Sequence, residues 1–152
     1  MSSSVHVIPE LPVVLMHLTG RAHIRALRSM IAGAYALPEY QVGMTEICDL
    51  SQVLNLDIGF DEMLRFAQES KTVHDVRGIS PDLFVIAPTD AAHYMLDMFE
   101  QLSGSLDNSL RIHLARGYPE IFAMMDWPET AMRHLPEYCK VEGHLFQENK
   151  PP

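Results

Sequence analysis

The chain has 152 residues, which is enough for one domain with a core of its own. Apolar residues make up 47% of the chain and charged residues 20%, a balance that excludes an intrinsically disordered protein. The net charge of −9 excludes general binding of nucleic acid or anionic membranes, because both require clustered Lys and Arg.

A hairpin and a helix are the first elements expected along the chain. Two short apolar runs, 5–8 and 13–18, flank a link that contains proline, and this pattern predicts an antiparallel β-hairpin. Residues 24–34 then carry apolar side chains at the i, i+3, i+7 spacing of one buried helix face. Pro38 ends this predicted helix.

The middle of the chain continues as strand, helix and strand. Residues 42–50 predict a strand, and an apolar stripe over 60–67 predicts the next helix. Asp57 stands where the N-cap of that helix is expected. The run 83–87 (LFVIA) is continuously apolar, which is typical of a strand covered on both faces.

The last third repeats the alternation. A turn at 88–90 leads into a helical stripe over 95–102, and residues 110–114 alternate as a strand does. Pro119 stands in the first turn of a fourth predicted helix, where its missing N–H costs little. One more helical turn is expected over 130–135.

This order of elements predicts an α/β domain. We expect a mostly parallel mixed sheet of about five strands with four helices, in which the N-terminal β-hairpin supplies one antiparallel edge. A single domain is expected over residues 1–135, followed by a C-terminal tail over 136–152 that is either docked or free.

The element order and the segment DLSQV at residues 49–53 resemble the STAS domain of anti-sigma-factor antagonists. The chain resembles a group of small STAS-like bacterial proteins more closely, through VIAPTD, YMLDMFEQL and a last strand and helix that end in Trp127. The resemblance covers about residues 12–127. It implies a fold that is often used for docking other proteins.

The antagonists carry a phosphoacceptor serine in a segment of the form DLSxVxxxDSSG. The matching segment here is DLSQVLNLDIGF, which keeps Ser51 and Asp57 but has Ile58 and Gly59 where the family has two serines. Neither of these side chains accepts phosphate. The resemblance therefore implies that the usual switch is absent, with Ser51 as the remaining candidate in this region.

No pattern of residues predicts catalysis. The sequence has no Gly-x-Ser-x-Gly elbow, no HExxH and no paired Cys-x-x-Cys. Asp90 and His93 have an i, i+3 spacing, but Asp90 is more simply an acid in the first turn of a helix. We therefore expect no catalytic residue, metal or cofactor, and a protein that is not an enzyme.

The two cysteines indicate the compartment. Cys48 is expected to be an inert residue inside a strand, and Cys139 to be exposed in the tail. Two cysteines make no disulfide framework, which favours the cytoplasm. The opening residues MSSSVHVIPE lack a basic segment followed by a long apolar run, so no signal peptide is expected. No stretch approaches the ~18 apolar residues of a membrane span.

An arginine stripe is the most unusual charge pattern. Arg21, Arg25 and Arg28 have the i, i+4, i+7 spacing that places residues on one side of a helix. Such a stripe can bind an anion or an acidic partner, because a guanidinium group donates two parallel hydrogen bonds to a carboxylate or phosphate. The alternative is a solvated face that pairs with the protein's own acids.

These patterns leave two hypotheses for function. The first is a non-catalytic, regulatory protein-interaction module whose partner is not known. The alternative is a protein that binds a small apolar ligand or an anion, with an apolar pocket lined by Met95, Met98 and Phe99.

The C-terminal part predicts a homodimer. Its large apolar residues are too many for a solvated tail, and we expect some of them to form a contact between two copies of the chain. They are Met132, Leu135, Tyr138, Val141, Leu145 and Phe146.

Overall fold

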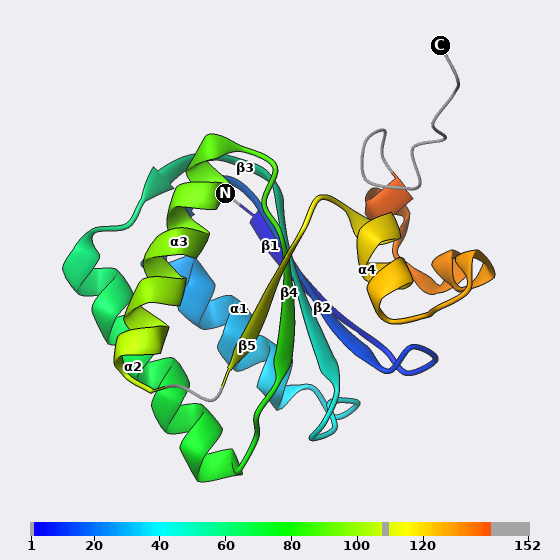
Figure 1. The fold of residues 1–152 in the computed structure, drawn as a ribbon, viewed down its shortest axis with the longest axis horizontal. Coiled ribbons are helices and arrows are strands. Elements are labelled where there is room, and N and C mark those ends of the chain that lie inside the picture. Colours follow the sequence, from blue (N-terminus) through cyan, green and yellow to red (C-terminus); the bar gives the residue numbers. More distant parts are fainter. Residues whose placement is uncertain (1, 108–109, 141–152) are drawn as a thin grey trace.

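A five-stranded mixed sheet forms the centre of this computed structural model, which describes residues 2–107 and 110–140 (Figure 1). The strand order is β1-β2-β3-β4-β5; β1 is antiparallel to β2, and the remaining pairs are parallel. The predicted α/β fold with an N-terminal hairpin is therefore confirmed. The strands are β1 (Ser2–Ile8), β2 (Val13–His23), β3 (Thr45–Asp57), β4 (Asp82–Ile86) and β5 (Arg111–Ala115).

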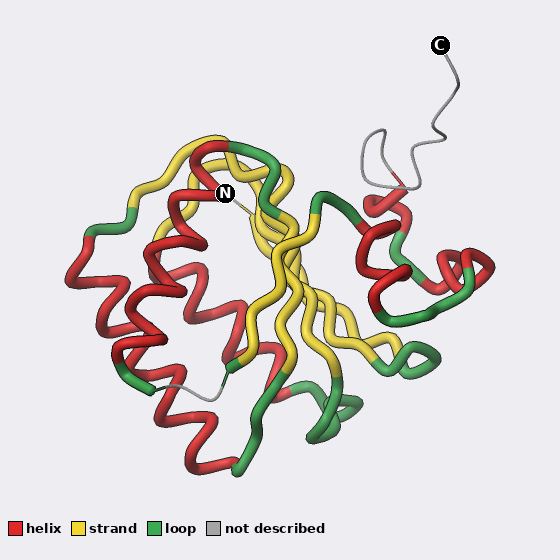
Figure 2. The backbone as a smooth tube through the Cα atoms, viewed as in Figure 1, coloured by secondary structure: helices red, strands yellow, loops and turns green. Residues whose placement is uncertain are grey.

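Helices cover the two faces of the sheet unequally (Figure 2). Each of the first three helices links one parallel strand to the next, always in the same direction along the sheet. Crossovers of one hand then place all three helices on the same face. These helices are α1 (Ile24–Ala36), α2 (Phe60–Arg77) and α3 (Asp90–Ser105).

Shorter elements cover the other face. They are α4 (Tyr118–Met124) and the 3-10 helices η1 (Glu129–His134) and η2 (Glu137–Lys140). Tyr118 and Phe122 of α4 pack with Leu135 and Cys139 in one buried cluster on this side. The prediction that Cys139 is exposed was wrong, because η2 turns its side chain into this second core, where it is fully buried.

Strands β2 and β3 extend further than the sequence predicted. Each continues past its expected end, and the two pair with one another as far as His23 and Asp57. Register shifts interrupt the ladder between His17 and Thr19 and again after Gly20, whose φ of 77° is the left-handed conformation that glycine adopts most easily. The predicted strand end at residue 50 was therefore wrong.

The start of α2 also differs from the prediction. Asp57 is the last residue of β3, and Gly59 occupies the N-cap of the helix. The Glu62 side chain returns to accept a hydrogen bond from the Gly59 N–H at 3.1 Å, which satisfies a donor that the helix itself cannot pair. By contrast, Thr89 caps α3 as the predicted turn implies, with its hydroxyl accepting from the Ala92 N–H at 3.1 Å.

Because the 3-10 segments pack against the sheet, we expect their buried side chains to contribute to the stability of the fold. Leu135 is 3% exposed, so Leu135→Ala should lower the free energy of unfolding by about 2–5 kcal/mol, since it removes buried apolar volume and leaves a cavity. Leu54→Ala is the matched control, because Leu54 is 70% exposed and should matter by no more than about 0.5 kcal/mol. Urea unfolding of both variants measures the difference, and equal effects would contradict this assignment.

Candidate functional site

A cavity of about 460 Å³ lies between the sheet and the layer formed by α1, α2 and α3. This volume falls within the range of small-molecule binding sites. Most of the wall is apolar and rich in methionine and phenylalanine. Residues that form it include Met30, Met63, Phe66, Val85, Met95 and Phe99.

The periodicity of each element determines which side chains reach the cavity. Alternate residues of β3, namely Glu46, Cys48 and Leu50, point to the face covered by the helices. On α2, Met63 and Phe66 begin a stripe that continues at helical spacing to Val73, His74 and Arg77. Sheet and helices thus supply a continuous apolar wall that changes to polar groups near the C-terminal end of α2.

A buried carboxyl group marks this polar end. Glu46 is 4% exposed, and the Tyr35 hydroxyl donates to it at 3.0 Å from Oε2 and 3.2 Å from Oε1. The Tyr35 oxygen also lies 3.4 Å from His74 Nε2, and the two hydrogen-bond in the tautomer that protonates Nε2. The Arg77 guanidinium stacks over the Tyr35 ring at 5.0 Å from its centroid.

Burial changes the acidity of the groups around this carboxyl. It raises the pKa of Glu46 to about 7, although the hydrogen bond from Tyr35 works in the opposite direction. Glu46 therefore changes charge near neutral pH. Burial, together with the charges of Asp49 and Glu46, raises the pKa of Cys48 to about 12. Cys48 is consequently a neutral thiol at physiological pH, as expected for an inert cysteine.

The arginine stripe is divided between two elements. Arg21 belongs to β2 and not to the first helix, whereas Arg25 and Arg28 lie on α1. Arg28 donates to both oxygens of Glu69 on α2, at 2.9 and 3.0 Å, and Arg21 Nε lies 3.7 Å from the Asp57 carboxylate. Both pairs match the alternative in which these arginines pair with the protein's own acids.

The candidate switch region also lies in two places. Ser51 is a half-buried residue of β3, and its hydroxyl and its backbone N–H both donate to Asp49 Oδ1. Gly59 lies at the beginning of α2, where it is the N-cap residue. Absence of a phosphorylation switch at this helix stays a prediction.

Two of the three predicted pocket residues line the cavity. Met95 and Phe99 belong to its wall together with Leu96, while Met98 packs against the same core without lining the cavity. Sequence reasoning missed Glu46, Tyr35 and His74. The sequence held one clue to this site. Glu46 is a charged residue on the same strand face as Cys48 and Leu50, which are expected to be buried.

A second buried carboxylate lies on the opposite face of the sheet. Asp49 Oδ2 accepts a 2.5 Å hydrogen bond from the Tyr118 hydroxyl, which also accepts a hydrogen bond from Cys139 Sγ at 3.3 Å. These contacts join β3 to the first residue of α4 and to η2. We assign this cluster a structural role, because all three side chains are buried within the second core.

No model of a known protein family matches the chain, and no curated protein matches it. The STAS resemblance therefore stays a prediction.

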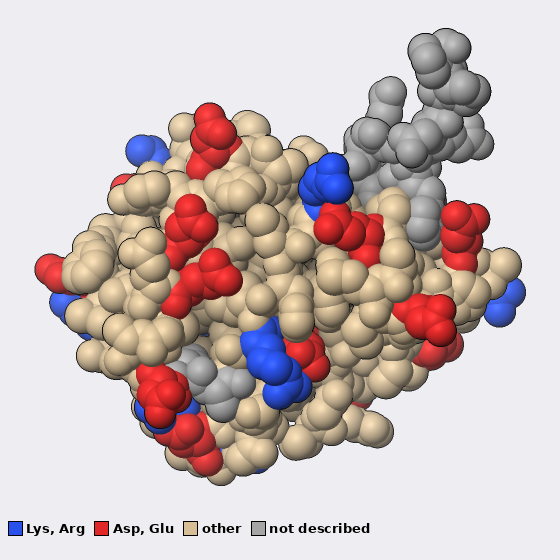
Figure 3. All heavy atoms as spheres, in the orientation of Figure 1, with Lys and Arg blue, Asp and Glu red and all other residues tan. Residues whose placement is uncertain are grey.

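The described part of the chain contains no group of three or more His, Cys, Asp or Glu side chains placed to hold a metal ion. None of its helices combines the length and apolarity that a membrane span needs. On the face drawn in Figure 3, Lys and Arg side chains are scattered, whereas several Asp and Glu side chains lie over α3.

The buried carboxyl group predicts a pH-dependent stability. The folded-state pKa of Glu46 lies above the ordinary value of 4.5, so the folded state holds the proton more tightly than the unfolded chain. This contribution is complete below about pH 4.5 and is lost as the pH rises through 7. At about 1.4 kcal/mol per pKa unit, wild-type protein should lose about 3 kcal/mol relative to Glu46→Gln over this range. Urea unfolding of both proteins between pH 4.5 and 8 tests this, and a constant difference would refute it.

Proposed function

We propose that the protein binds a small apolar molecule in the cavity between the sheet and helices α1, α2 and α3. The observation that carries this proposal is a cavity of about 460 Å³ whose wall is mainly apolar and whose polar groups include the linked side chains of Glu46, Tyr35 and His74. An apolar wall supplies affinity, while a few converging polar groups fix orientation. Core packing rarely leaves such a volume, because empty space costs stability.

Binding without catalysis is the form of this proposal that the site supports. Cys48 is the cysteine in the wall, and its raised pKa leaves little thiolate to act as a nucleophile.

We further propose a cytoplasmic protein, since Cys48 and Cys139 form no disulfide. The arginine stripe does not favour the anion-binding form of the hypothesis, because Arg21 and Arg28 face acids of the same chain.

A pair of substitutions on α2 tests ligand binding. Val73 lines the cavity, so Val73→Trp should fill part of it and weaken binding of n-decanol at least tenfold. Val76 is on the same helix but 81% exposed, so Val76→Trp should bind n-decanol as wild type does. Isothermal titration calorimetry measures both affinities. Failure of wild type to bind n-decanol, n-decylamine and n-decanoic acid alike, or equal n-decanol binding by both variants, would overturn the proposal.

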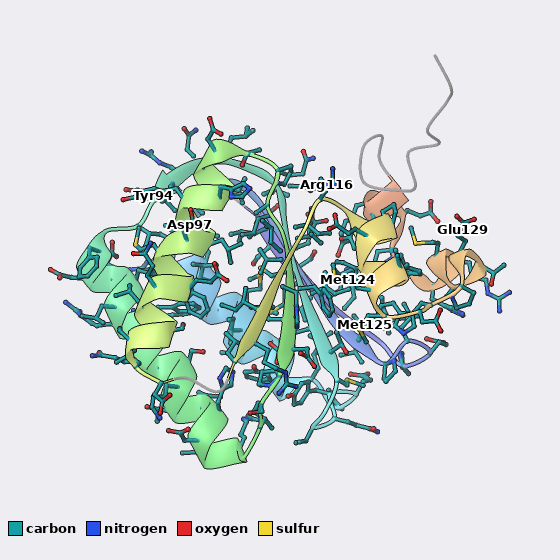
Figure 4. All side chains as sticks on the ribbon, in the orientation of Figure 1. Tyr94, Asp97, Arg116, Met124, Met125 and Glu129 are labelled. Atoms are coloured by element: carbon teal, nitrogen blue, oxygen red, sulfur yellow. The ribbon has the colours of Figure 1, made fainter. Side chains whose placement is uncertain are left out.

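Protein docking, the function implied by the STAS resemblance, is our second proposal. The observation that supports it is the position of β5 at an edge of the sheet, where one side of the strand has no neighbour among the described strands. Such an edge can pair with a strand from another chain. Leu114 of β5 is 45% exposed, and Met124 of α4, which Figure 4 labels, is 47% exposed.

We place the contact of the proposed homodimer at the same edge of the sheet, along β5. Met132 and Leu135, which motivated a dimer through the tail, are buried against the chain's own sheet, and Tyr138 is half-buried there. Val141, Leu145 and Phe146 lie outside the described residues. The β5 edge therefore supports a dimer better than the tail does.

Light scattering tests this dimer. Full-length wild type should have twice the monomer mass, and Leu114→Glu should shift it toward the monomer, because a charge at the edge opposes strand pairing. Leu54→Glu is the control at a position that is 70% exposed on β3, and it should leave the mass unchanged. A wild-type monomer would exclude the dimer, and a dimer that survives Leu114→Glu would place the contact elsewhere.

A further inference from the structure

The charges around the cavity differ in how completely they are neutralised. Arg28 and Glu69 neutralise one another through two hydrogen bonds. Glu46 is different, because no Lys or Arg within residues 2–107 and 110–139 forms an ion pair with it. Its hydrogen-bond partner is the neutral hydroxyl of Tyr35. The polar end of the cavity is thus a carboxyl group that lacks a cation.

The groups facing Glu46 do not supply that cation. The Tyr35 hydroxyl on α1 contacts both the carboxyl group and His74 on α2. Arg77 also lines the cavity, but its guanidinium stacks over the Tyr35 ring and forms no ion pair with Glu46. Tyr40 is close enough for the Glu46 charge to raise its pKa, after the larger effect of its own burial.

The neighbouring strands add no positive charge either. Cys48 is the titratable neighbour on β3, and its pKa is raised. The residues paired with Glu46 across the sheet are apolar, Val14 on β2 and Leu83 on β4.

We infer that the ligand is a protonated amine on an apolar body, with its ammonium group paired to the Glu46 carboxylate. This inference rests on the proposed function, because it requires the cavity to be the binding site. A carboxylate in an apolar cavity has lost its water, so an ammonium group that donates to it recovers much of that loss. A fatty acid would instead bring a second anion to Glu46, which like-charge repulsion opposes.

Binding of an amine depends on the charge of Glu46. Because its pKa is about 7, roughly one site in eleven is ionised at pH 6 and ten in eleven at pH 8. An alkylamine is protonated across this range, as its pKa resembles the lysine value of about 10.4. The affinity for an amine should therefore rise about tenfold from pH 6 to pH 8, while the affinity for a neutral alcohol should not follow this curve.

Three ligands with one chain length separate these possibilities. Isothermal titration calorimetry measures the binding of n-decylamine, n-decanol and n-decanoic acid at pH 6 and at pH 8. The full-length proteins compared are wild type, Glu46→Gln and Glu129→Gln. Glu129→Gln is the control, because it makes the same chemical change away from the cavity. Glu129 lies on the opposite side of the sheet from Tyr94 and Asp97 of α3 (Figure 4). Wild type should bind n-decylamine most tightly at pH 8, and Glu129→Gln should behave as wild type.

The Glu46→Gln variant gives the decisive result. It should bind n-decylamine at least tenfold more weakly at pH 8 and lose the pH dependence, while it keeps its affinity for n-decanol within twofold. Retained n-decanol binding shows that the variant is folded and its cavity intact. If n-decanol binds wild type but n-decylamine binds no more tightly, or n-decanoic acid binds best, this inference alone fails. If none of the three binds, the proposed function fails with it.

Discussion

The alternation of side chains along β3 determines how the two halves of the molecule are built. Successive residues of a strand point to opposite faces, so Glu46 enters the cavity while Asp49, three residues later, enters the core beneath α4. Each face thus receives one buried acid, and each acid accepts a hydrogen bond from a tyrosine, Tyr35 on α1 or Tyr118 on α4. A shift of the β3 register by one residue would exchange these faces and remove both contacts.

The regular features of the fold were predictable because they are local. The hairpin, the order of strands and helices, and the Thr89 cap each depend on a few neighbouring residues. The ends of β2 and β3 were not predictable, since each strand continues only because the other is beside it. That pairing also kept Arg21 in a strand and separated it from the helix of Arg25.

The candidate site was predictable in part for the same reason. Met95 and Phe99 are neighbours on one helix face, so their spacing indicated a shared wall. Glu46, Tyr35 and His74 come from three elements, and only the sheet order and the packing of α1 and α2 bring them together. Cys139 illustrates the converse error, because its polar, proline-rich neighbours suggested exposure while the open face of the sheet was available to cover it.

The sulfur atoms in the cavity wall have a consequence for the molecules it accepts. Met16, Met30, Met63 and Met95 surround the space with unbranched side chains that change rotamer at little cost. A wall of this kind adapts its shape to its contents, so selectivity has to come from the polar end rather than from steric fit. The same thioethers are open to oxidation, and each sulfoxide would replace an apolar surface by a strong dipole. An oxidant that reached the cavity would therefore make its wall polar and weaken its affinity for apolar molecules.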